Sequence, residues 1–402
     1  MKVYQGNGAP VTTTYGNVGD YYLDLNTDKM YKCVDIVNHG LDRQFLTMYD
    51  SHPDRTEYVW ESNSYGIKDF SYFCGAYEKS SSTVKMHRLD EIAHIDTSCG
   101  TTFRYMFLDC TTLTSIPELD TSNGTDFGRM FYGCTNLTSI PELDTSNGMM
   151  FYGMFYKCAK LESIPELDTS NGTNFYNMFY GCTKLTSIPE LDTSNGTNFS
   201  EMFYGCTNLT SIPELDTSNG TNFSKMFYGC TKLTSIPELD TSNGTNFSEM
   251  FRNCTNLTSI PELDTSNGTS VSYMFYSCTN LTSIPKLDSN KSTSLANIFY
   301  NCKALAYLRL YNIRVAVQIG SGSSYGHLLD VDSLVHTIKE LCKVSSSTTL
   351  TMGTTNKGKI ANLYCKIVDD TTEKLEMELC ESTDANAMTL EEYAAEKGWT
   401  IA

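Results

Sequence analysis

The sequence predicts an α/β repeat solenoid, a stack of coils in which each coil contributes a short helix and a short strand. Leucines recur every 24 residues at ten positions from Leu89 to Leu305, and segments such as residues 185–208 return almost unchanged. A fixed period in this range is typical of stacked repeats, with one supersecondary unit per period. Cysteines keep the same step at Cys110, Cys134, Cys158, Cys182, Cys206, Cys230, Cys254, Cys278 and Cys302.

The first half of each coil is predicted to form the helix. In the copy that begins at Phe199, apolar residues stand at positions i, i+3, i+4 and i+7, which would place them on one helical face. Asn198 is expected to cap this helix. Glu201, three residues after the cap, is the expected partner in a capping box.

The second half of each coil is predicted to form the strand. Leu209, Ile212 and Leu215 supply its apolar residues, and Pro213 keeps it short because proline donates no hydrogen bond to a ladder. Residues 216–220, Asp-Thr-Ser-Asn-Gly, have the composition of a turn, with a glycine free to take a positive φ. One coil buries too few apolar side chains to offset the entropy of ordering it, so the coils are expected to fold together.

The repeat resembles the BspA-type leucine-rich repeat of bacterial surface proteins, which also occurs in phage structural proteins. The matching pattern is L-x-S-I, then D-T-S-N, then M-F-x-x-C, and it covers roughly residues 88–312. The resemblance implies a leucine-rich-repeat-like solenoid. Pro-Glu-Leu stands where the usual repeat has a second strand leucine, so this strand is expected to differ in detail from that of the family.

Length and charge exclude several classes of partner. The chain has 402 residues, enough for two or three domains, and a net charge of −18. This charge argues against nucleic acid and against anionic membrane surfaces as partners. No stretch approaches the about 18 apolar residues of a membrane span, so membrane insertion is not expected. The first residues lack the apolar core of a secretory signal, and no C-terminal anchor is recognisable.

The periodic cysteines are predicted to be free thiols in the core. Equivalent residues of stacked coils point the same way, whereas a disulfide needs two Cβ atoms that face each other. Cysteine is also a small side chain that is commonly buried. No C-x-x-C pair occurs and no histidine accompanies the series, so a metal site is not expected there.

Residues 1–62 differ from the repeats and are expected to form a β-rich module. Runs at 21–25 and 29–34 flank a polar turn and predict a hairpin, 58–61 is the expected third strand, and 39–55 look inserted. The string GNVGDYYLDLNTDKMYKCV resembles a small module near the N-termini of phage tail-fibre and head-fibre proteins. This resemblance implies docking to other virion proteins. The alternative is a cap that shields the first coil.

The remaining boundaries place a transition at 63–87, the solenoid at 88–312 and a C-terminal capping domain at 313–402. The tail resembles the segment that often follows such repeats in phage and prophage proteins. Helices are expected from Asp330 or Asp332 through Cys342, over 357–368 and after Thr389, and strands at 348–352, 375–379 and 399–401.

No catalytic constellation is recognisable, so the protein is not expected to be an enzyme. The six histidines are scattered, and the motifs of zinc proteases, serine hydrolases and phosphate-binding loops are missing. Carboxylates form one column from Glu118 to Glu262 and another from Asp120 to Asp264. They are interpreted either as solvated glutamates and turn-bonding aspartates, or as a row of weak Ca²⁺ sites. No other cofactor is expected.

A row of tyrosines is the candidate binding site. Each follows a core phenylalanine by one residue, which on a helix would turn it about 100° away from the core. The tyrosines either pack on one another between coils, or form an aromatic strip suited to sugar rings or a protein groove. Arg252 breaks the row, and the copies differ mainly three residues before each of its positions. The row consists of Tyr132, Tyr156, Tyr180, Tyr204, Tyr228, Tyr276 and Tyr300.

These observations favour a phage virion protein, a tail- or head-fibre subunit that docks through residues 1–62 and displays the repeats for host attachment. Its expected partners are other virion proteins and a host cell-surface protein or glycan, and a homo-oligomer is left open. The alternative is an adhesin located on the bacterial cell surface. The lack of a recognisable signal and anchor favours the virion, because phages leave the cell by lysis.

Overall fold

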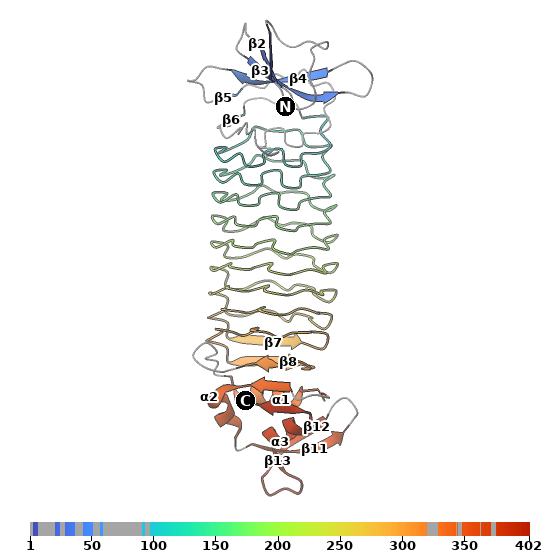
Figure 1. Cartoon of the computed structure of the whole chain (residues 1–402), viewed down its shortest axis with the longest axis vertical. Helices are drawn as coiled ribbons and strands as arrows, with labels where there is room; N and C mark the ends of the chain where they lie inside the picture. Colours follow the sequence, from blue (N-terminus) through green and yellow to red (C-terminus); the bar gives the residue numbers. More distant parts are fainter. Residues whose placement is uncertain are drawn as a thin grey trace. The chain divides into compact units, whose positions relative to one another are not determined.

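Figure 1 shows the computed structural model of the chain, which folds into two compact units, Met1–Gly172 and Thr173–Ala402. Both units contain 24-residue coils, so the predicted repeat solenoid is confirmed. In the strands before residue 97 and in parts of the C-terminal segment, the backbone alone is described. The described residues are 97–319, 329–342, 344, 348–361, 363–370 and 375–402, together with six short strands before residue 97.

Neighbouring coils are joined by backbone hydrogen bonds that we call the alternating ladder. In the second unit, every other N–H group of one half-coil donates to the next coil, namely those of Phe199, Glu201, Phe203 and Gly205. The N···O distances are 2.7–2.9 Å, and the acceptors are the carbonyl oxygens of Asn222, Ser224, Met226 and Tyr228. The N–H groups between them bond within their own coil. Every amide of this half-coil therefore has a partner.

The short helix expected in this half-coil is wrong, because successive turns take its place. Two residues four positions apart have left-handed backbone, with φ of +56° at Glu201 and +69° at Gly205. An α-helix needs φ near about −63° throughout and would direct each N–H along its own axis, away from the next coil. Asn198 does not cap a helix either, because its Oδ1 accepts from the N–H of Ser200 and closes an Asx turn. The expected capping box therefore does not form.

The second half of each coil makes few backbone bonds. Buried residues recur at every third position, at Cys206, Leu209, Ile212 and Leu215. A β-strand would bury every second residue. Pro213, which has no N–H, adds to this interruption. The predicted strand is therefore wrong for most copies, and between residues 97 and 282 the structure has only isolated bridges.

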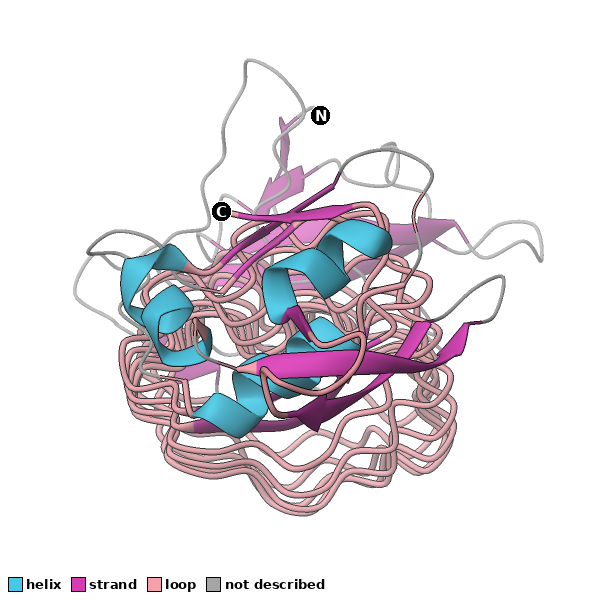
Figure 2. Ribbon diagram, turned by 90° about the horizontal axis from the view of Figure 1, so that it is seen from below, coloured by secondary structure: helices cyan, strands magenta, loops and turns pink. Residues whose placement is uncertain are grey.

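Regular strands appear only at the end of the array. β7 (Ser283–Asp288) and β8 (Tyr307–Tyr311) pair in parallel in the second unit. Figure 1 labels both at the point where the coils give way to the C-terminal segment. In Figure 2 the preceding coils are drawn almost wholly as loops, shown in pink, whereas the helices belong to the segment that follows them.

The Asp-Thr-Ser-Asn-Gly turn is held by side chains that reach into both neighbouring coils. Asp216 accepts at Oδ1 from the N–H and the hydroxyl of Ser218, at 3.0 and 2.6 Å. The buried hydroxyl of Thr217 donates to an aspartate carbonyl of the next coil at 2.8 Å. The side-chain amide of Asn219 donates to a serine carbonyl of the preceding coil at 2.7 Å. The turn therefore fixes the spacing of three coils at once.

The glycine of this turn serves close packing and not backbone freedom. Gly220 was expected to take a positive φ, but it is not among the positive-φ glycines of the described chain. A Cβ at this position would stand 2.5 Å from the ring of Phe223 and 2.9 Å from the carbonyl oxygen of Thr217. Any larger residue would therefore push a core phenylalanine out of its column.

The interior is built from columns of identical side chains. Phe203, Met202, Cys206 and Leu209 have no exposed surface, and their equivalents in other coils are buried to the same degree. The ring of Phe203 stacks on the corresponding phenylalanines of the coils before and after it, with centroids 5.6 Å apart in both cases. The predicted inward columns are thus confirmed in the described coils of both units.

The strands before residue 97 are described by their backbone alone. The first sheet has the order β1 (Val3–Gly6), β2 (Tyr21–Asp24), β3 (Lys29–Ile36), β4 (Arg43–Asp50). β2 and β3 pair antiparallel, which confirms the predicted hairpin, and β4 pairs with β3 inside the stretch expected to be inserted. The third predicted strand is represented by β5 (Glu57–Tyr58), which pairs with β6 (Glu91–Ile92). Residues 59–61 lie outside the described residues.

In its described residues, the C-terminal segment of the second unit contains two three-stranded sheets and three helices. Among the described residues, no helix is long and apolar enough to cross a membrane. The parallel sheet consists of β9 (Val317–Gln318), β10 (Thr348–Thr351) and β14 (Trp399–Ile401). The antiparallel sheet consists of β11 (Tyr364–Asp370), β12 (Leu375–Cys380) and β13 (Met388–Thr389). The helices are α1 (Val331–Lys339), α2 (Gly353–Ile360) and α3 (Leu390–Glu396).

Most predicted elements of this segment are confirmed. Asp330 caps α1 by accepting from the N–H of Ser333 at 2.6 Å, and Thr389 forms a capping box with Glu392 at the start of α3. The helix expected over 357–368 is wrong, because α2 ends at Ile360 and the chain continues into β11. β11 is the central strand of its sheet, so ladder bonds on both sides outweigh its local helical pattern.

Replacing Phe203 with Ala should lower the free energy of unfolding by about 3–5 kcal/mol, because it leaves a cavity between two stacked rings. The measurement is urea unfolding followed by circular dichroism. Glu214→Ala, at an exposed position of the same coil, is the matched control and should change the value by less than about 0.5 kcal/mol. Equal effects of the two variants would contradict a core built from the phenylalanine column.

Candidate functional site

The tyrosines proposed as a binding site form stacked columns on the surface. In the first unit the rings of Tyr132 and Tyr156 have centroids 4.3 Å apart. In the second unit the distance is 4.4 Å for Tyr180–Tyr204 and Tyr204–Tyr228, and 4.7 Å for Tyr276–Tyr300. All seven side chains are half-buried. The tyrosines therefore pack on one another between coils and still keep part of each ring accessible, and their use as a binding strip stays a prediction.

Two tyrosines of the column have a pKa above the usual value for the residue. Burial raises the pKa of Tyr204, and the neighbouring hydroxyl of Tyr228 acts in the same direction. Burial and the adjacent Tyr156 likewise raise the pKa of Tyr132. Tyr132 and Tyr204 thus offer neutral hydroxyl groups that can both donate and accept hydrogen bonds.

Arg252 continues the column and does not break it. Its guanidinium carbon lies 5.5 Å from the ring centroid of Tyr228 in the preceding coil and 4.6 Å from that of Tyr276 in the following coil. Glu249 holds the guanidinium by an ion pair of 2.9 Å. Because a planar cation is attracted to the faces of aromatic rings, Arg252 can take the place of a tyrosine in the stack.

The side chains that differ between copies stand beside the column. In the second unit, the ammonium group of Lys225 lies 3.7 Å from the carboxylate of Glu201 and 3.9 Å from that of Glu249. All three side chains are partly exposed. Ion pairs of this kind contribute about 0–1 kcal/mol each, so they add little to the stability of the coils.

The backbone at these variable positions is left-handed in every copy. Glycine occupies the position once, as Gly153 with φ of +59°. A side chain in this region costs about 1–2 kcal/mol, which glycine avoids. Six other copies nevertheless carry side chains of five kinds there, with φ of +55° to +59°, namely Arg129, Asn177, Glu201, Lys225, Glu249 and Tyr273. We call these positions, together with the tyrosine columns and Arg252, the tyrosine strip.

Two functional candidates in the first unit were missed by the sequence reasoning. Tyr105 and Tyr152 lie outside the predicted row, yet both rings lie 5.6 Å from the guanidinium carbon of Arg129. The signal that could have revealed them is the glycine at positions 128 and 153, where most other copies carry larger residues. A glycine that replaces a larger residue in one copy indicates a side chain from elsewhere that needs the space.

The repeated aspartates serve their own turns. Hydrogen bonds from the serine two residues later lower the pKa of Asp144, Asp192 and Asp216. This agrees with the turn-bonding interpretation of the aspartate column. In the part of the chain that the structure describes, no group of three or more His, Cys, Asp or Glu residues could hold a metal ion. Weak Ca²⁺ binding by the Asp and Glu columns stays a prediction.

The periodic cysteines are free thiols, as predicted. The Sγ atom of Cys206 donates to the carbonyl oxygen of Phe179 in the preceding coil at 3.0 Å, and the same contact recurs in other coils. Burial raises the pKa of Cys206 to about 12 and that of Cys254 to about 12. The thiols are therefore protonated core groups and not candidate nucleophiles.

The buried thiols should make the protein sensitive to alkali. An unfolded cysteine titrates near pH ~8.5, whereas the folded pKa of Cys206 is about 12. The folded state thus favours the neutral thiol, so its stabilisation is complete below pH ~8.5 and is lost as the pH rises above that value. The free energy of unfolding, measured with urea, should be lower at pH 10 than at pH 8. Cys206→Ala removes one of the buried thiols, so it should make this difference smaller by the contribution of one thiol.

Alkylation with iodoacetamide followed by peptide mass spectrometry provides the second readout. At pH 8 the column thiols of the native protein should remain unlabelled, while exposed Cys99 reacts. Rapid labelling of Cys206, or a bridge between Cys206 and Cys230 under non-reducing conditions, would show that the thiols are not sealed in the core.

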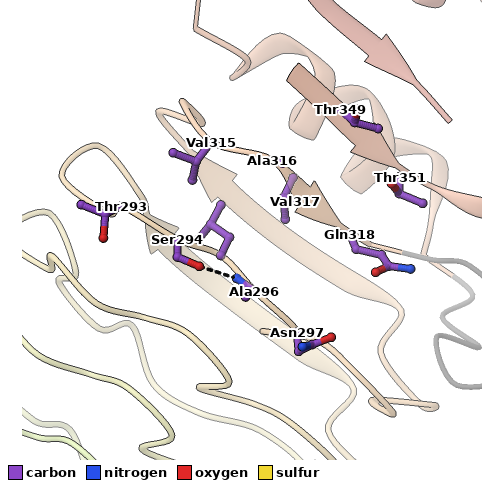
Figure 3. Close-up of a pocket in the computed structure, with 11 residues that line it drawn as sticks. Thr293, Ser294, Ala296, Asn297, Val315, Ala316, Val317, Gln318, Thr349 and Thr351 are labelled. Carbon is purple, nitrogen blue, oxygen red and sulfur yellow. Dashed lines mark hydrogen bonds between the residues drawn. The ribbon is translucent and has the colours of Figure 1, made fainter. Parts of the chain in front are cut away.

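A pocket of about 440 Å³ lies in the second unit, between a coil and the parallel sheet. Figure 3 shows its lining, which comes from residues 293–297 of the coil, residues 315–318 and two threonines of β10. The polar groups are hydroxyls and amides, and the lining contains no histidine, cysteine, lysine, arginine or carboxylate. The pocket thus lacks a general acid or base and offers at most a neutral binding site.

Comparison with known families gives a match to the repeats. A family model described as "Mycoplasma protein of unknown function, DUF285" matches residues 85–163, 101–212, 151–236 and 197–310. Together these matches span residues 85–310, more than half of the chain. None of the curated proteins compared with the chain matches it.

The solved structures that match include three of low sequence identity. A leucine-rich repeat protein of T. pallidum is 19% identical, with 57% of this chain and 85% of that chain covered and a TM-score of 0.25. A leucine-rich repeat protein from Eubacterium ventriosum is 14% identical, with 71% and 90% covered and a TM-score of 0.32. A leucine rich cell surface protein from Faecalibacterium prausnitzii is 18% identical, with 77% and 97% covered and a TM-score of 0.29.

Proposed function

The chain belongs to the DUF285 family of repeat proteins, and from this premise we propose that it is a binding protein, an adhesin of the bacterial cell surface. Its proposed contact surface is the tyrosine strip. Its proposed partner is a host cell-surface protein or glycan. The resemblance of the repeats to the BspA-type repeat of bacterial surface proteins supports this location.

The left-handed variable positions are the observation that carries the proposal. Nearly identical coils differ mainly where a side chain is conformationally unfavourable and where Gly153 demonstrates that glycine is accommodated. The ion pairs made there are weak, so stability does not account for Glu201, Lys225 and Glu249. A binding surface does account for them, because contact with a partner requires a particular pattern of side chains.

The tyrosine columns supply the common part of this surface. Their rings are held rigid by stacking, so a partner that contacts them loses little entropy in ordering the site. Neighbouring coils repeat the same group, so weak contacts with a repetitive partner can add by multivalency. A net charge of −18 opposes approach to an acidic cell envelope, which favours contacts through aromatic and hydroxyl groups.

The test replaces the variable side chains without disturbing the coil. Asparagine tolerates left-handed backbone and is already present as Asn177. The triple variant Glu201→Asn, Lys225→Asn, Glu249→Asn should therefore keep its melting temperature. Its adsorption to cultured animal cells, measured with fluorescently labelled protein, should fall about tenfold or more.

The matched control removes three charges from the same region. The control changes three exposed glutamates that are not part of the tyrosine strip, namely Glu190, Glu214 and Glu238. Their replacement by Asn should leave adsorption unchanged. Equal loss in both variants would show that the effect does not depend on the tyrosine strip and would contradict the proposal. Wild-type protein that adsorbs to no cell type or mucin surface would contradict it as well.

A further inference from the structure

Three successive coils of the first unit depart from the common pattern beside the tyrosine column. Where three later copies have serine followed by glutamate or lysine, as at Ser200 and Glu201, these coils have Arg-Tyr at 104–105, Gly-Arg at 128–129 and Tyr-Gly at 152–153. The large and small residues are exchanged between neighbouring coils. Such an exchange indicates side chains that cross from one coil to the next.

The two glycines provide the space for this crossing. A Cβ at Gly128 would stand 2.4 Å from the ring of Tyr152, so this ring lies across the preceding coil. A Cβ at Gly153 would stand 3.0 Å from Cγ of Arg129, so the arginine lies across the following coil. Both glycines therefore belong to one built arrangement, which a serine at either position would obstruct.

The result is a cluster of two guanidinium groups among three tyrosine rings. The guanidinium carbon of Arg104 lies 5.0 Å from the centroid of Tyr105 and 5.5 Å from that of Tyr152. That of Arg129 lies 5.6 Å from both of these rings and 5.7 Å from Tyr132. We call Arg104, Tyr105, Arg129, Tyr132 and Tyr152 the arginine–tyrosine cage.

The cage holds two guanidinium groups, and the carboxylate of Asp126 acts electrostatically on one of them, that of Arg104. Arg252 is held by an ion pair with Glu249, whereas the contacts of Arg129 in the cage are with tyrosines. Arg129 donates from Nη1 to the hydroxyl of Tyr105 at 2.7 Å. Burial alone would raise the pKa of Tyr105, but the hydrogen bonds from the two arginines outweigh it and lower that pKa. The cage thus has a positive local field in a protein of net charge −18.

We propose that the arginine–tyrosine cage binds the single acidic group of an otherwise neutral glycan, a carboxylate or a sulfate on a sugar ring. This inference rests on the proposed adhesive function and names its ligand class. A guanidinium binds both acids through parallel hydrogen bonds, and each arginine has five N–H donors. Tyrosine rings contact the C–H faces of the sugar, and their hydroxyls reach its hydroxyl groups.

The net charge of the protein should make the cage select sugars with one acidic group over polyanions. A polyanion such as heparin should be repelled overall, because the protein has a net charge of −18. A glycan with one acidic group meets the cage and has no further negative charge to be repelled. Binding should therefore be stronger for a singly charged sugar than for a polyanion of the same size.

The test titrates the full-length protein with 3′-sialyllactose, with lactose 3′-sulfate and with neutral lactose, by calorimetry or ligand-observed NMR. At least one acidic sugar should bind about tenfold or more tightly than lactose, and the preferred acid identifies the group recognised. Arg104→Gln with Arg129→Gln should abolish this preference. Arg314→Gln, at an exposed arginine of the second unit, is the matched control and should retain it.

A conservative variant separates geometry from charge. Arg129→Lys keeps the positive charge but loses the planar fork, so affinity for the acidic sugar should fall while the melting temperature stays unchanged. Acidic sugars that bind no better than lactose, a double variant that binds like the wild type, or a preference for heparin would each overturn the inference. If the protein still adsorbs to cells when one of these results is obtained, the proposed adhesive function is not contradicted. Acidic-sugar binding without any cell adsorption would instead support the cage and contradict the adhesive function.

Discussion

The alternating ladder between coils is the interaction on which the rest of the structure depends. From Phe199 to Cys206, N–H groups alternately bond the next coil and return to their own. This half-coil thus satisfies all its amide donors with neither a helix nor a regular strand. Because an unsatisfied buried amide costs about 1–3 kcal/mol, this pattern constrains the spacing and orientation of neighbouring coils within each unit.

The ladder also explains why the surface can vary. Its bonds come from the backbone, so the fold does not depend on the side chain at the left-handed position. Gly153, Lys225 and Tyr273 have nearly the same φ despite their different chemistry, at +59°, +55° and +58°. A constant backbone with a changeable outer position gives each coil the same core and its own surface. The arginine–tyrosine cage is the place where three neighbouring coils use this freedom together.

The sequence predicts the core better than the backbone that holds it. The 24-residue step identifies the buried columns, because stacked coils repeat each apolar side chain. The i, i+3, i+4, i+7 spacing wrongly indicates a helix, since turns with a left-handed residue at Glu201 and Gly205 produce the same burial. Glycine often has left-handed backbone, so Gly205 was a sequence signal against a helix. Glu201 gave no such signal, because glutamate rarely adopts this conformation.

Contacts between coils were the least predictable part of the candidate site. The sequence places Tyr204 on the surface but leaves its stacking open, and it shows Arg252 as an interruption, although the guanidinium lies near the rings on both sides. The ring of Tyr152 lies against Gly128, which is 24 residues earlier in the sequence, so no local sequence pattern predicts its position. None of the comparisons supports the virion role expected from the N-terminal resemblance, and docking through residues 1–62 stays a prediction.

Amide hydrogen exchange, measured by NMR or by mass spectrometry with short peptides, tests the alternating ladder most directly. The amides of Phe199 and Glu201 should be as strongly protected as that of Phe203, because all three bond the next coil. In a helix beginning at Phe199, the first four N–H groups would have no intrahelical partner. Fast exchange at Phe199 and Glu201 with slow exchange after residue 203 would therefore contradict the ladder and restore the helix.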